Sequence, residues 1–115
     1  MQLDTLKNTI SPILKSGSVH LAYIFGSYAR SDADQYSDID LVIIADSERA
    51  FVDRFVDFWD LWNLVEPSID LLVYTPREWE QMKLCKNPLA MKIIEEGILL
   101  YERSAEGSRA LAEAS

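Results

Sequence analysis

The sequence predicts one small α/β domain, because short apolar, β-prone segments alternate with segments whose apolar residues recur every three or four positions. The chain has 115 residues, of which 49% are apolar. This length suits one hydrophobic core and leaves little chain for a second, since domains usually run to about 100–150 residues. We therefore expect one domain over residues 1–103 and a flexible C-terminal tail over 104–115.

The first part of the chain is expected to contain one helix and two strands. Apolar residues at three- to four-residue spacing over residues 3–15 predict an amphipathic helix that ends before Gly17. An apolar, β-prone run predicts a buried strand over 19–25 that stops at a glycine-serine turn. The next apolar run, written DIDLVIIA, predicts a second strand over 38–45.

A long helix is expected over residues 50–66, because aromatic and aliphatic residues form one stripe and aspartates lie opposite. The apolar arc is wider than a surface helix needs, so we expect core packing together with an exposed patch for a partner subunit. The surplus aromatic residues of that patch are Phe58, Trp59 and Trp62. Pro67 stops the helix, and the run SIDLLVYT predicts a third strand over 68–75. Two more helices and a short strand follow, over residues 76–85, 89–96 and 98–101.

The charge balance is acidic, with 19 Asp and Glu residues against 11 Lys and Arg residues. Direct nucleic-acid binding is therefore not expected, since phosphate backbones are bound by concentrated basic surfaces. An acidic excess near a nucleotide must be compensated by cations. The composition thus favours a metal-dependent enzyme over a metal-free nucleotide binder.

The sequence also indicates a cytoplasmic protein without a membrane segment. Cys85 is the only cysteine, so no internal disulfide can form and a reducing compartment is the natural setting. The start, MQLDTLKNTI, lacks the residue order of a secretory signal. No apolar run approaches the ~20 residues that cross a bilayer.

Three aspartates are candidate metal ligands. Asp38 and Asp40 lie two residues apart on an expected strand, so both carboxylates project to the same side, and Asp70 faces that side if its strand is the neighbour. Carboxylates among apolar residues are costly unless they are paired or coordinated, and Mg²⁺ prefers such oxygen ligands. The alternative is that Asp38 caps a strand and Asp40 faces solvent, since an isolated Asp-x-Asp pattern is common.

Gly26 and Ser27 follow the first strand directly, and Tyr28 to Arg30 begin what reads as a short helix. Glycine lets backbone amides approach a phosphate, a hydroxyl adds a donor, and a helix N-terminus favours negative charge. A Gly-Ser pair alone is more often a simple turn. Arg30 could contact a phosphate or could pair with Asp32 or Asp34.

The combined pattern is GSYARSDADQYSDIDL, and it resembles the signature of the DNA polymerase beta type nucleotidyltransferase superfamily. In that signature a Gly-Ser pair and, about ten residues later, Asp-x-Asp precede a third carboxylate on a later strand. The matching residues here are Gly26, Ser27, Asp38, Asp40 and Asp70. The resemblance covers roughly residues 1–101 and implies a small mixed β-sheet flanked by helices. It also implies that Ser27, with the Gly26 backbone, holds the β and γ phosphates of ATP.

The resemblance extends to catalytic roles. Asp38 and Asp40 would bridge two Mg²⁺ ions, and Asp70 would complete the site of the catalytic ion and help to deprotonate the attacking hydroxyl.

The small size and the GSYAR opening are most similar to minimal nucleotidyltransferases (MNT proteins, the MntA-like antitoxins), which are usually encoded beside a HEPN-domain ribonuclease toxin. This resemblance implies an antitoxin that forms a hetero-oligomer with a HEPN toxin and transfers AMP from ATP to a tyrosine hydroxyl of that toxin. One departure is Ser31, where many relatives have glycine.

Two alternatives remain at this stage. One is a small-molecule nucleotidyltransferase resembling the aminoglycoside-modifying enzymes, although these usually carry a further helical domain for which this chain has no residues left. The other is a non-catalytic antitoxin that neutralises the toxin by binding alone. The presence of all three aspartates and Ser27 argues against an inactive site.

Overall fold

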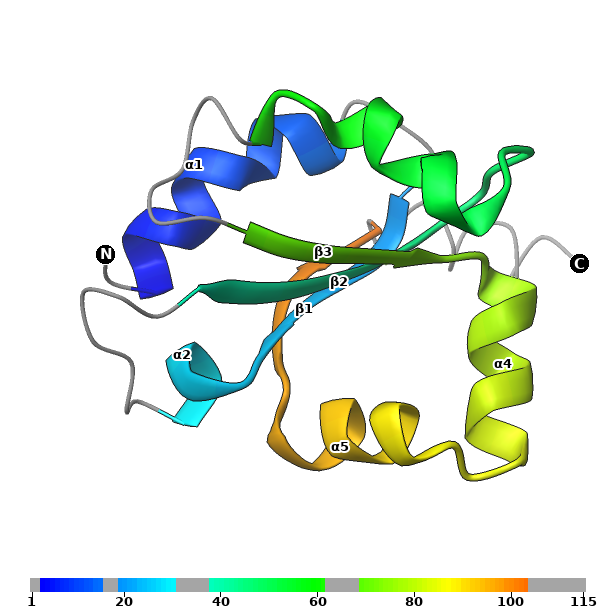
Figure 1. Ribbon diagram of the computed structural model, residues 1–115. Coiled ribbons are helices and arrows are strands. Elements are labelled where there is room, and N and C mark those ends of the chain that lie inside the picture. The colour runs from blue at the N-terminus through cyan, green and yellow to red at the C-terminus, as the bar shows by residue number, and fades with distance from the viewer. Residues whose placement is uncertain (1–2, 16–18, 31–37, 62–68, 104–115) are drawn as a thin grey trace, which may run out of the picture.

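Short strands and helices alternate along the chain as the sequence pattern predicts. The computed structural model describes residues 3–15, 19–30, 38–61 and 69–103 (Figure 1). Its strands are β1 (Val19–Phe25), β2 (Ile39–Ala45), β3 (Ile69–Tyr74) and β4 (Ile98–Glu102). Its helices are α1 (Leu3–Lys15), α2 (Ser27–Arg30), the 3₁₀ helix η1 (Phe51–Phe58), α4 (Pro76–Leu84) and α5 (Pro88–Glu96). The expected tail over residues 104–115 lies outside the described residues.

The strands form one mixed sheet in the order β3-β2-β1-β4. Strand β1 is antiparallel to both β2 and β4, whereas β2 and β3 are parallel. A parallel neighbour requires a crossover connection, and the chain between β2 and β3, which includes η1, supplies it. The predicted α/β fold, a small mixed sheet flanked by helices, is confirmed.

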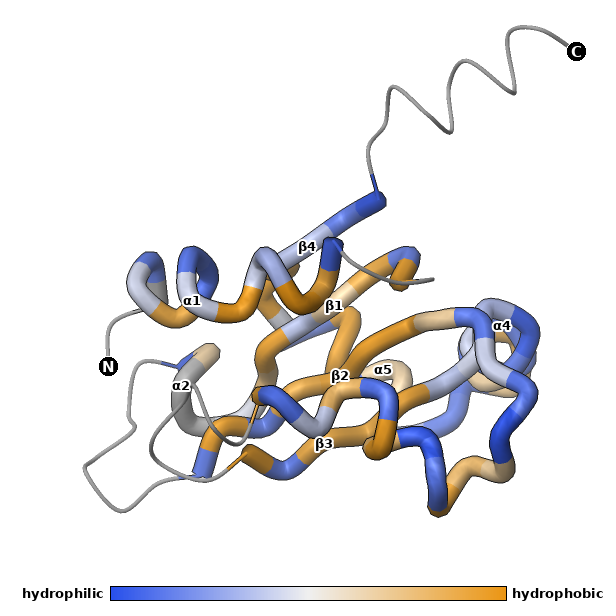
Figure 2. Tube along the Cα trace, turned by 90° about the horizontal axis from the view of Figure 1, so that it is seen from above, coloured by the Kyte–Doolittle hydropathy of each residue, from blue (hydrophilic) through white to orange (hydrophobic). Residues whose placement is uncertain are grey.

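Helices cover both faces of this sheet: α1 and η1 lie above it and α4 and α5 below it in Figure 1. Strand β2 alternates its side chains between two apolar cores. Ile39, Leu41 and Ile43 pack on the α1 side, while Val42 and Ile44 pack on the α4–α5 side. Burial on both faces explains why this strand reads as a continuous apolar run, which Figure 2 shows along β2.

Both helices of the lower layer begin at a proline that follows a capping side chain. The Glu78 N–H donates to the Thr75 hydroxyl (3.2 Å), and the Thr75 N–H donates to the Glu78 carboxylate (2.9 Å). This capping box begins α4 at Pro76. The Asn87 side chain likewise accepts two backbone N–H groups at the start of α5. No helix in the described part of the chain is long and apolar enough to span a lipid bilayer.

The helix expected over residues 50–66 differs from the structure. Residues 51–58 form the 3₁₀ helix η1, a turn follows at 59–60, and residues 62–66 lie outside the described residues. The buried residues of η1 are Arg54 and Phe58, so the expected apolar stripe is not its inner face. Phe51 and Phe55 remain 42% and 38% exposed.

Arg54 explains this difference. Its guanidinium donates to the Glu78 carboxylate, to the Val73 carbonyl oxygen (3.1 Å) and to the Arg49 carbonyl oxygen (3.1 Å). A buried charge is tolerated when it is paired and hydrogen-bonded in this way. This network turns Arg54 inward and leaves apolar residues of η1 outside.

The predicted partner patch stays a prediction. Its expected member Phe58 is wrong, because Phe58 is buried in the core, whereas Trp59 is 59% exposed. Trp62 lies outside the described residues.

Candidate active site

The direction of the Asp40 side chain follows from the alternation of β2. Ile39 and Leu41 belong to the core on the α1 side, so Asp40 between them projects to the side of α4 and α5. It is the only residue of β2 that is not fully buried. The strand therefore holds a partly covered carboxylate at its beginning.

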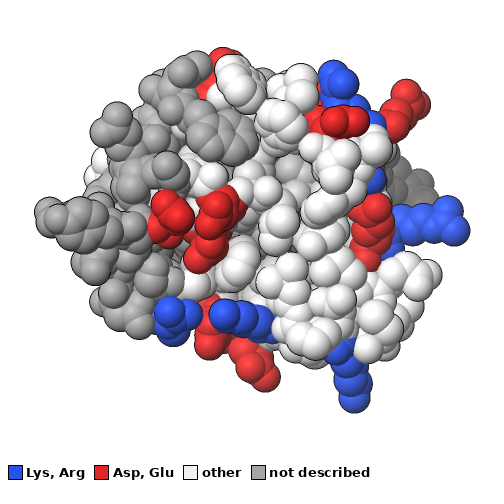
Figure 3. Space-filling model, viewed as in Figure 1, with Lys and Arg blue, Asp and Glu red and all other residues white. Residues whose placement is uncertain are grey.

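Asp70 lies beside Asp40 on the neighbouring strand. In the parallel register of β2 and β3 these two residues are direct partners, and such strands lie about 4.8 Å apart. Asp38 precedes β2 and is exposed, as is Asp70. The three aspartates thus gather where β2 and β3 begin, and Figure 3 shows acidic side chains grouped at that end of the sheet.

Gly26 connects the end of β1 to this group. It follows Phe25, the β1 partner of Asp40 in the antiparallel register, and has a φ of 75°. Few residues other than glycine adopt that conformation readily. A Cβ at this position would also collide with the Asp40 carboxylate. Both the backbone angle and the space therefore require glycine here.

The helix α2 starts immediately after this glycine. The Arg30 N–H donates to the Gly26 carbonyl oxygen at 3.0 Å and closes its turn. Ser27 is the first residue of α2, and its side chain lies outside the described side chains.

The electrostatic surroundings of Asp40 are unfavourable for its charged form. Burial raises the pKa of the Asp40 carboxyl, and the neighbouring charges of Asp70 and Asp38 raise it further. The positive charges of Lys92 and Arg30 lower the pKa of Asp40. Figure 3 shows basic side chains beside the acidic group. The cluster is therefore a concentration of negative charge with partial compensation.

The donor chemistry of this cluster fits a hard divalent cation. All three candidate ligands are carboxylates, which Mg²⁺ prefers, and the charges of Asp70 and Asp38 act on Asp40 in addition to its burial, raising the pKa of its carboxyl. Within the described residues, no group of three or more His, Cys, Asp or Glu side chains is already arranged to bind a metal ion. The fit to the ion thus rests on the donor chemistry of the three carboxylates.

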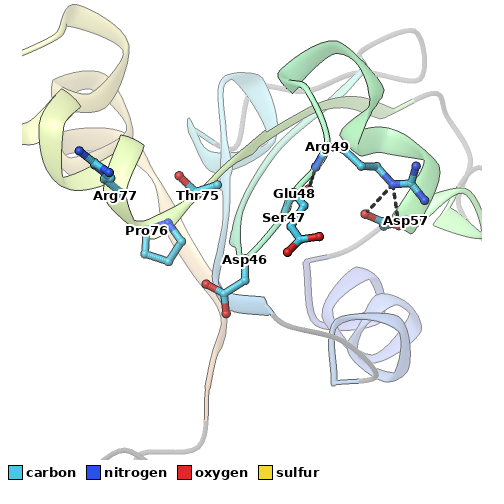
Figure 4. Close-up of a pocket in the computed structure, with 8 residues that line it drawn as sticks. All are labelled: Asp46, Ser47, Glu48, Arg49, Asp57, Thr75, Pro76 and Arg77. Atoms are coloured by element: carbon cyan, nitrogen blue, oxygen red, sulfur yellow. Dashed lines mark hydrogen bonds and ion pairs between the residues drawn. The ribbon is translucent and has the colours of Figure 1, made fainter.

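Two open hollows border the described residues, and neither contains an aspartate of this cluster. One, of about 880 Å³, lies near the opposite ends of β2 and β3; Figure 4 shows the Arg49–Asp57 ion pair in its wall (3.2 Å). The other, of about 560 Å³, lies between Phe51, Tyr74 and the helix α4.

A family model described as "Polymerase beta, Nucleotidyltransferase" matches residues 8–106. The chain belongs to this nucleotidyltransferase family. A curated relative from Methanocaldococcus jannaschii, named "Putative protein adenylyltransferase MJ0435", is 32% identical to this nucleotidyltransferase over 74 residues. The match covers 64% of this chain and 80% of the relative.

Solved structures share the fold of this nucleotidyltransferase. A chain in the crystal structure of a toxin-antitoxin with AMP-PNP has a TM-score of 0.61 and 21% identity, covering 87% of this chain and 76% of that chain. A chain in the complex of the tri-AMPylated Shewanella oneidensis HEPN toxin with MNT antitoxin has a TM-score of 0.54 and 20% identity, covering 91% and 76%. At these identities the likeness concerns the fold.

The nucleotidyltransferase fold brings together most of the residues expected from the sequence. Asp40, Asp70 and Gly26 are neighbours by register and by close approach, and Asp38 lies within electrostatic reach of Asp40. Arg30 is tied to Glu96 of α5 (Nη1 to Oε2, 3.6 Å).

Three residues named from the sequence are not described by the structure, and one residue near the site was not expected from the sequence. Ser31, Asp32 and Asp34 lie outside the described residues. Lys92 of α5 was not expected at this nucleotidyltransferase site, because no local pattern connects it to aspartates on distant strands.

Proposed function

We propose that this nucleotidyltransferase is the antitoxin of a HEPN–MNT pair and transfers AMP from ATP to a tyrosine hydroxyl of its HEPN toxin. The observation that carries the proposal is the pairing of Asp40 with Asp70 beside Gly26, at the same end of the sheet as Asp38. The described relatives support it, since one is named as a protein adenylyltransferase and another lies in a complex with an AMPylated toxin.

Each residue of the site has a role in this reaction. The Gly26 backbone and Ser27 bind the β and γ phosphates, and Asp38, Asp40 and Asp70 hold Mg²⁺, expected as two ions. When bound, Mg²⁺ neutralises triphosphate charge and stabilises the attacking and leaving oxygens. The remaining contribution of the chain is to position ATP, which is the larger part of catalysis in such transfers.

The transfer itself exchanges one bond at phosphorus for another. The tyrosine oxygen bonds to the α phosphorus, the bond from that phosphorus to the bridging oxygen breaks, and pyrophosphate leaves. Asp70, which is exposed, accepts the phenolic proton as the oxygen attacks.

A protein acceptor fits this site better than a small molecule. Asp38 and Asp70 are exposed, so a tyrosine carried on the surface of another protein can reach them. A small acceptor needs an enclosing pocket to orient it. A tyrosine carried on another protein is oriented by that protein's own docking.

The test is label transfer from α-labelled ATP to a HEPN partner in the presence of Mg²⁺. The wild-type chain should label the partner, and the Asp38→Ala/Asp40→Ala double variant should not. A matched control is Asp53→Ala/Asp60→Ala, which removes two exposed carboxylates in and just after η1 and should keep the transfer. Mass spectrometry should find AMP on a tyrosine of the partner.

Two results would contradict the proposal. Label that persists in the Asp38→Ala/Asp40→Ala variant would remove these residues from the chemistry. A tight complex without any label would replace transfer by the binding-only antitoxin.

A further inference from the structure

The outer side of α5 is turned toward the candidate site. Ala90 and Ile93 are buried in the core beneath the sheet, whereas Lys92 and Glu96 are exposed. Residues four apart on a helix lie above one another, so Lys92 and Glu96 share one side of α5. The contacts of Glu96 therefore indicate where Lys92 lies.

The Arg30–Glu96 ion pair fixes where that side of α5 points. It joins the end of α5 to α2, the short helix that starts directly after Gly26. Gly26 in turn lies against the Asp40 carboxylate. Lys92, one turn before Glu96, thus stands beside the aspartate end of the sheet, and its charge is among those that act on Asp40.

Lys92 and Arg30 differ in how they are held. Arg30 is bound to Glu96, whereas Lys92 forms no ion pair with any residue of the described ranges. A lysine ammonium is a compact charge on a flexible stem, and such a group suits a phosphate chain that arrives with the substrate. If Mg²⁺ neutralised the aspartates, the phosphates of the nucleotide would be the negative charge that remains for Lys92 to bind.

We propose that Lys92 binds the polyphosphate chain of the incoming nucleoside triphosphate, opposite the side held by Gly26 and Ser27. The inference rests on the proposed nucleotidyl transfer and adds a residue to it. The site then has two walls: the turn after β1 on one side and α5 on the other. AMP lacks the β and γ phosphates that Lys92 is proposed to bind, so the contribution of Lys92 should be seen with ATP and not with AMP.

The test is nucleotide binding by the purified full chain, titrated with ATP, ADP and AMP in the presence of Mg²⁺. Lys92→Met keeps the length of the side chain and removes its charge. It should bind ATP about tenfold more weakly, since hydrogen bonds to charged groups contribute at that level, and should bind AMP as the wild type does. Lys92→Arg should recover most of the ATP affinity. In transfer assays, Lys92→Met should raise the KM for ATP.

The matched control is Lys7→Met, which removes the same charge from an exposed position on α1, on the other face of the sheet. It should bind ATP normally, and both methionine variants should melt at the wild-type temperature. Should Lys92→Met prove unstable, Lys92→Gln repeats the measurement.

The outcomes separate this inference from the function on which it rests. A wild-type chain that neither binds ATP nor transfers AMP would overturn the proposed function and the role of Lys92 with it. Normal transfer by the wild type with unchanged ATP affinity in Lys92→Met would overturn the role of Lys92 alone. Equal losses of ATP and AMP affinity would also overturn it, because they would indicate a general disturbance of the site.

Discussion

At the scale of single residues, Gly26 and Asp40 form the closest unit of the candidate site. Glycine occupies a left-handed conformation, and its missing side chain leaves room for the carboxylate of the adjacent strand. Asp40 is in turn the polar interruption of an otherwise buried strand. The two positions are therefore expected to respond together to substitution.

Gly26→Ala should destabilise the fold and abolish AMP transfer. A left-handed conformation costs other residues about 1–3 kcal/mol, and the new methyl group would collide with Asp40. Urea unfolding of Gly26→Ala, Asp40→Ala and the double variant separates these two contributions. If the collision with the Asp40 carboxylate matters, Gly26→Ala should lower the free energy of unfolding less in the Asp40→Ala variant than in the wild type. Strict additivity would show that backbone strain alone is responsible.

At the scale of elements, the crossover between β2 and β3 is organised by Arg54. This residue of η1 reaches α4 through Glu78 and the end of β3 through the Val73 carbonyl. One buried cation thereby joins three consecutive elements. Its partner Glu78 also begins α4, so the ion pair and the capping box share one carboxylate.

The Arg54–Glu78 contact should make stability depend on pH in the acid range. The hydrogen bond from Arg54 lowers the pKa of Glu78 below its ordinary value of 4.5. When the pKa of a carboxyl is lower in the folded protein than in the unfolded chain, its ionised form stabilises the folded state. This stabilisation is fully present at pH values above the pKa of the unfolded chain, and it is lost as the pH falls through the pKa of the folded protein. The gap in unfolding free energy between wild type and Glu78→Gln should therefore be widest near neutral pH and narrow below about pH 4.5.

Urea unfolding at a series of pH values measures this gap. Glu80→Gln is the control, because Glu80 pairs with Lys83 on the exposed side of α4 and should give a small, nearly constant difference. A gap for Glu78→Gln that did not change with pH would rule out the ionised contact as its source.

The central strand should be the most sensitive element of the core. Ile43 of β2 is fully buried, whereas Ile94 of α5 is 51% exposed. Ile43→Ala should cost about 2–5 kcal/mol of unfolding free energy, because it leaves a cavity between packed layers. Ile94→Ala is the matched control and should stay within about 0.5 kcal/mol of the wild type. Similar losses in the two variants, measured by urea unfolding, would contradict the burial of β2 in the core on the α1 side.

At the scale of the whole molecule, the site lies at one end of a mixed sheet with a helix layer on each face. The chain carries a net charge of −8, and the three aspartates add to that charge at one place. A bound cation and its nucleotide would relieve this concentration. Ligand binding and folding are therefore expected to be coupled.

ATP should raise the melting temperature only when Mg²⁺ is present. A ligand at 100 times its Kd stabilises the folded state by about 2.7 kcal/mol, and EDTA should remove this effect if the aspartates act through metal. Asp40→Asn should lose the response to ATP. Without nucleotide it should be at least as stable as the wild type, because burial and two neighbouring carboxylates oppose the charge of Asp40. Thermal scans with and without EDTA measure both effects, and an ATP response that survives EDTA would exclude the metal.

The sequence by itself determined the strands, most helices and the family. Alternating or continuous apolar runs and proline or glycine boundaries are local signals, and the Gly-Ser and Asp-x-Asp pattern lies within one short segment of chain. Such signals are visible because the interactions behind them act between residues that are near in sequence. The predicted tail and partner patch stay predictions, and the residue roles are tested by the experiments above.

Tertiary structure decided the remainder. The register of β3 against β2 placed Asp70 beside Asp40. The packing of α5 put the charge of Lys92 within electrostatic reach of Asp40, and Arg54 took a buried position on η1 beside Phe58. Each placement involves partners that are far apart in the chain. Their contacts depend on how the sheet pairs and how the layers pack, which no local pattern specifies.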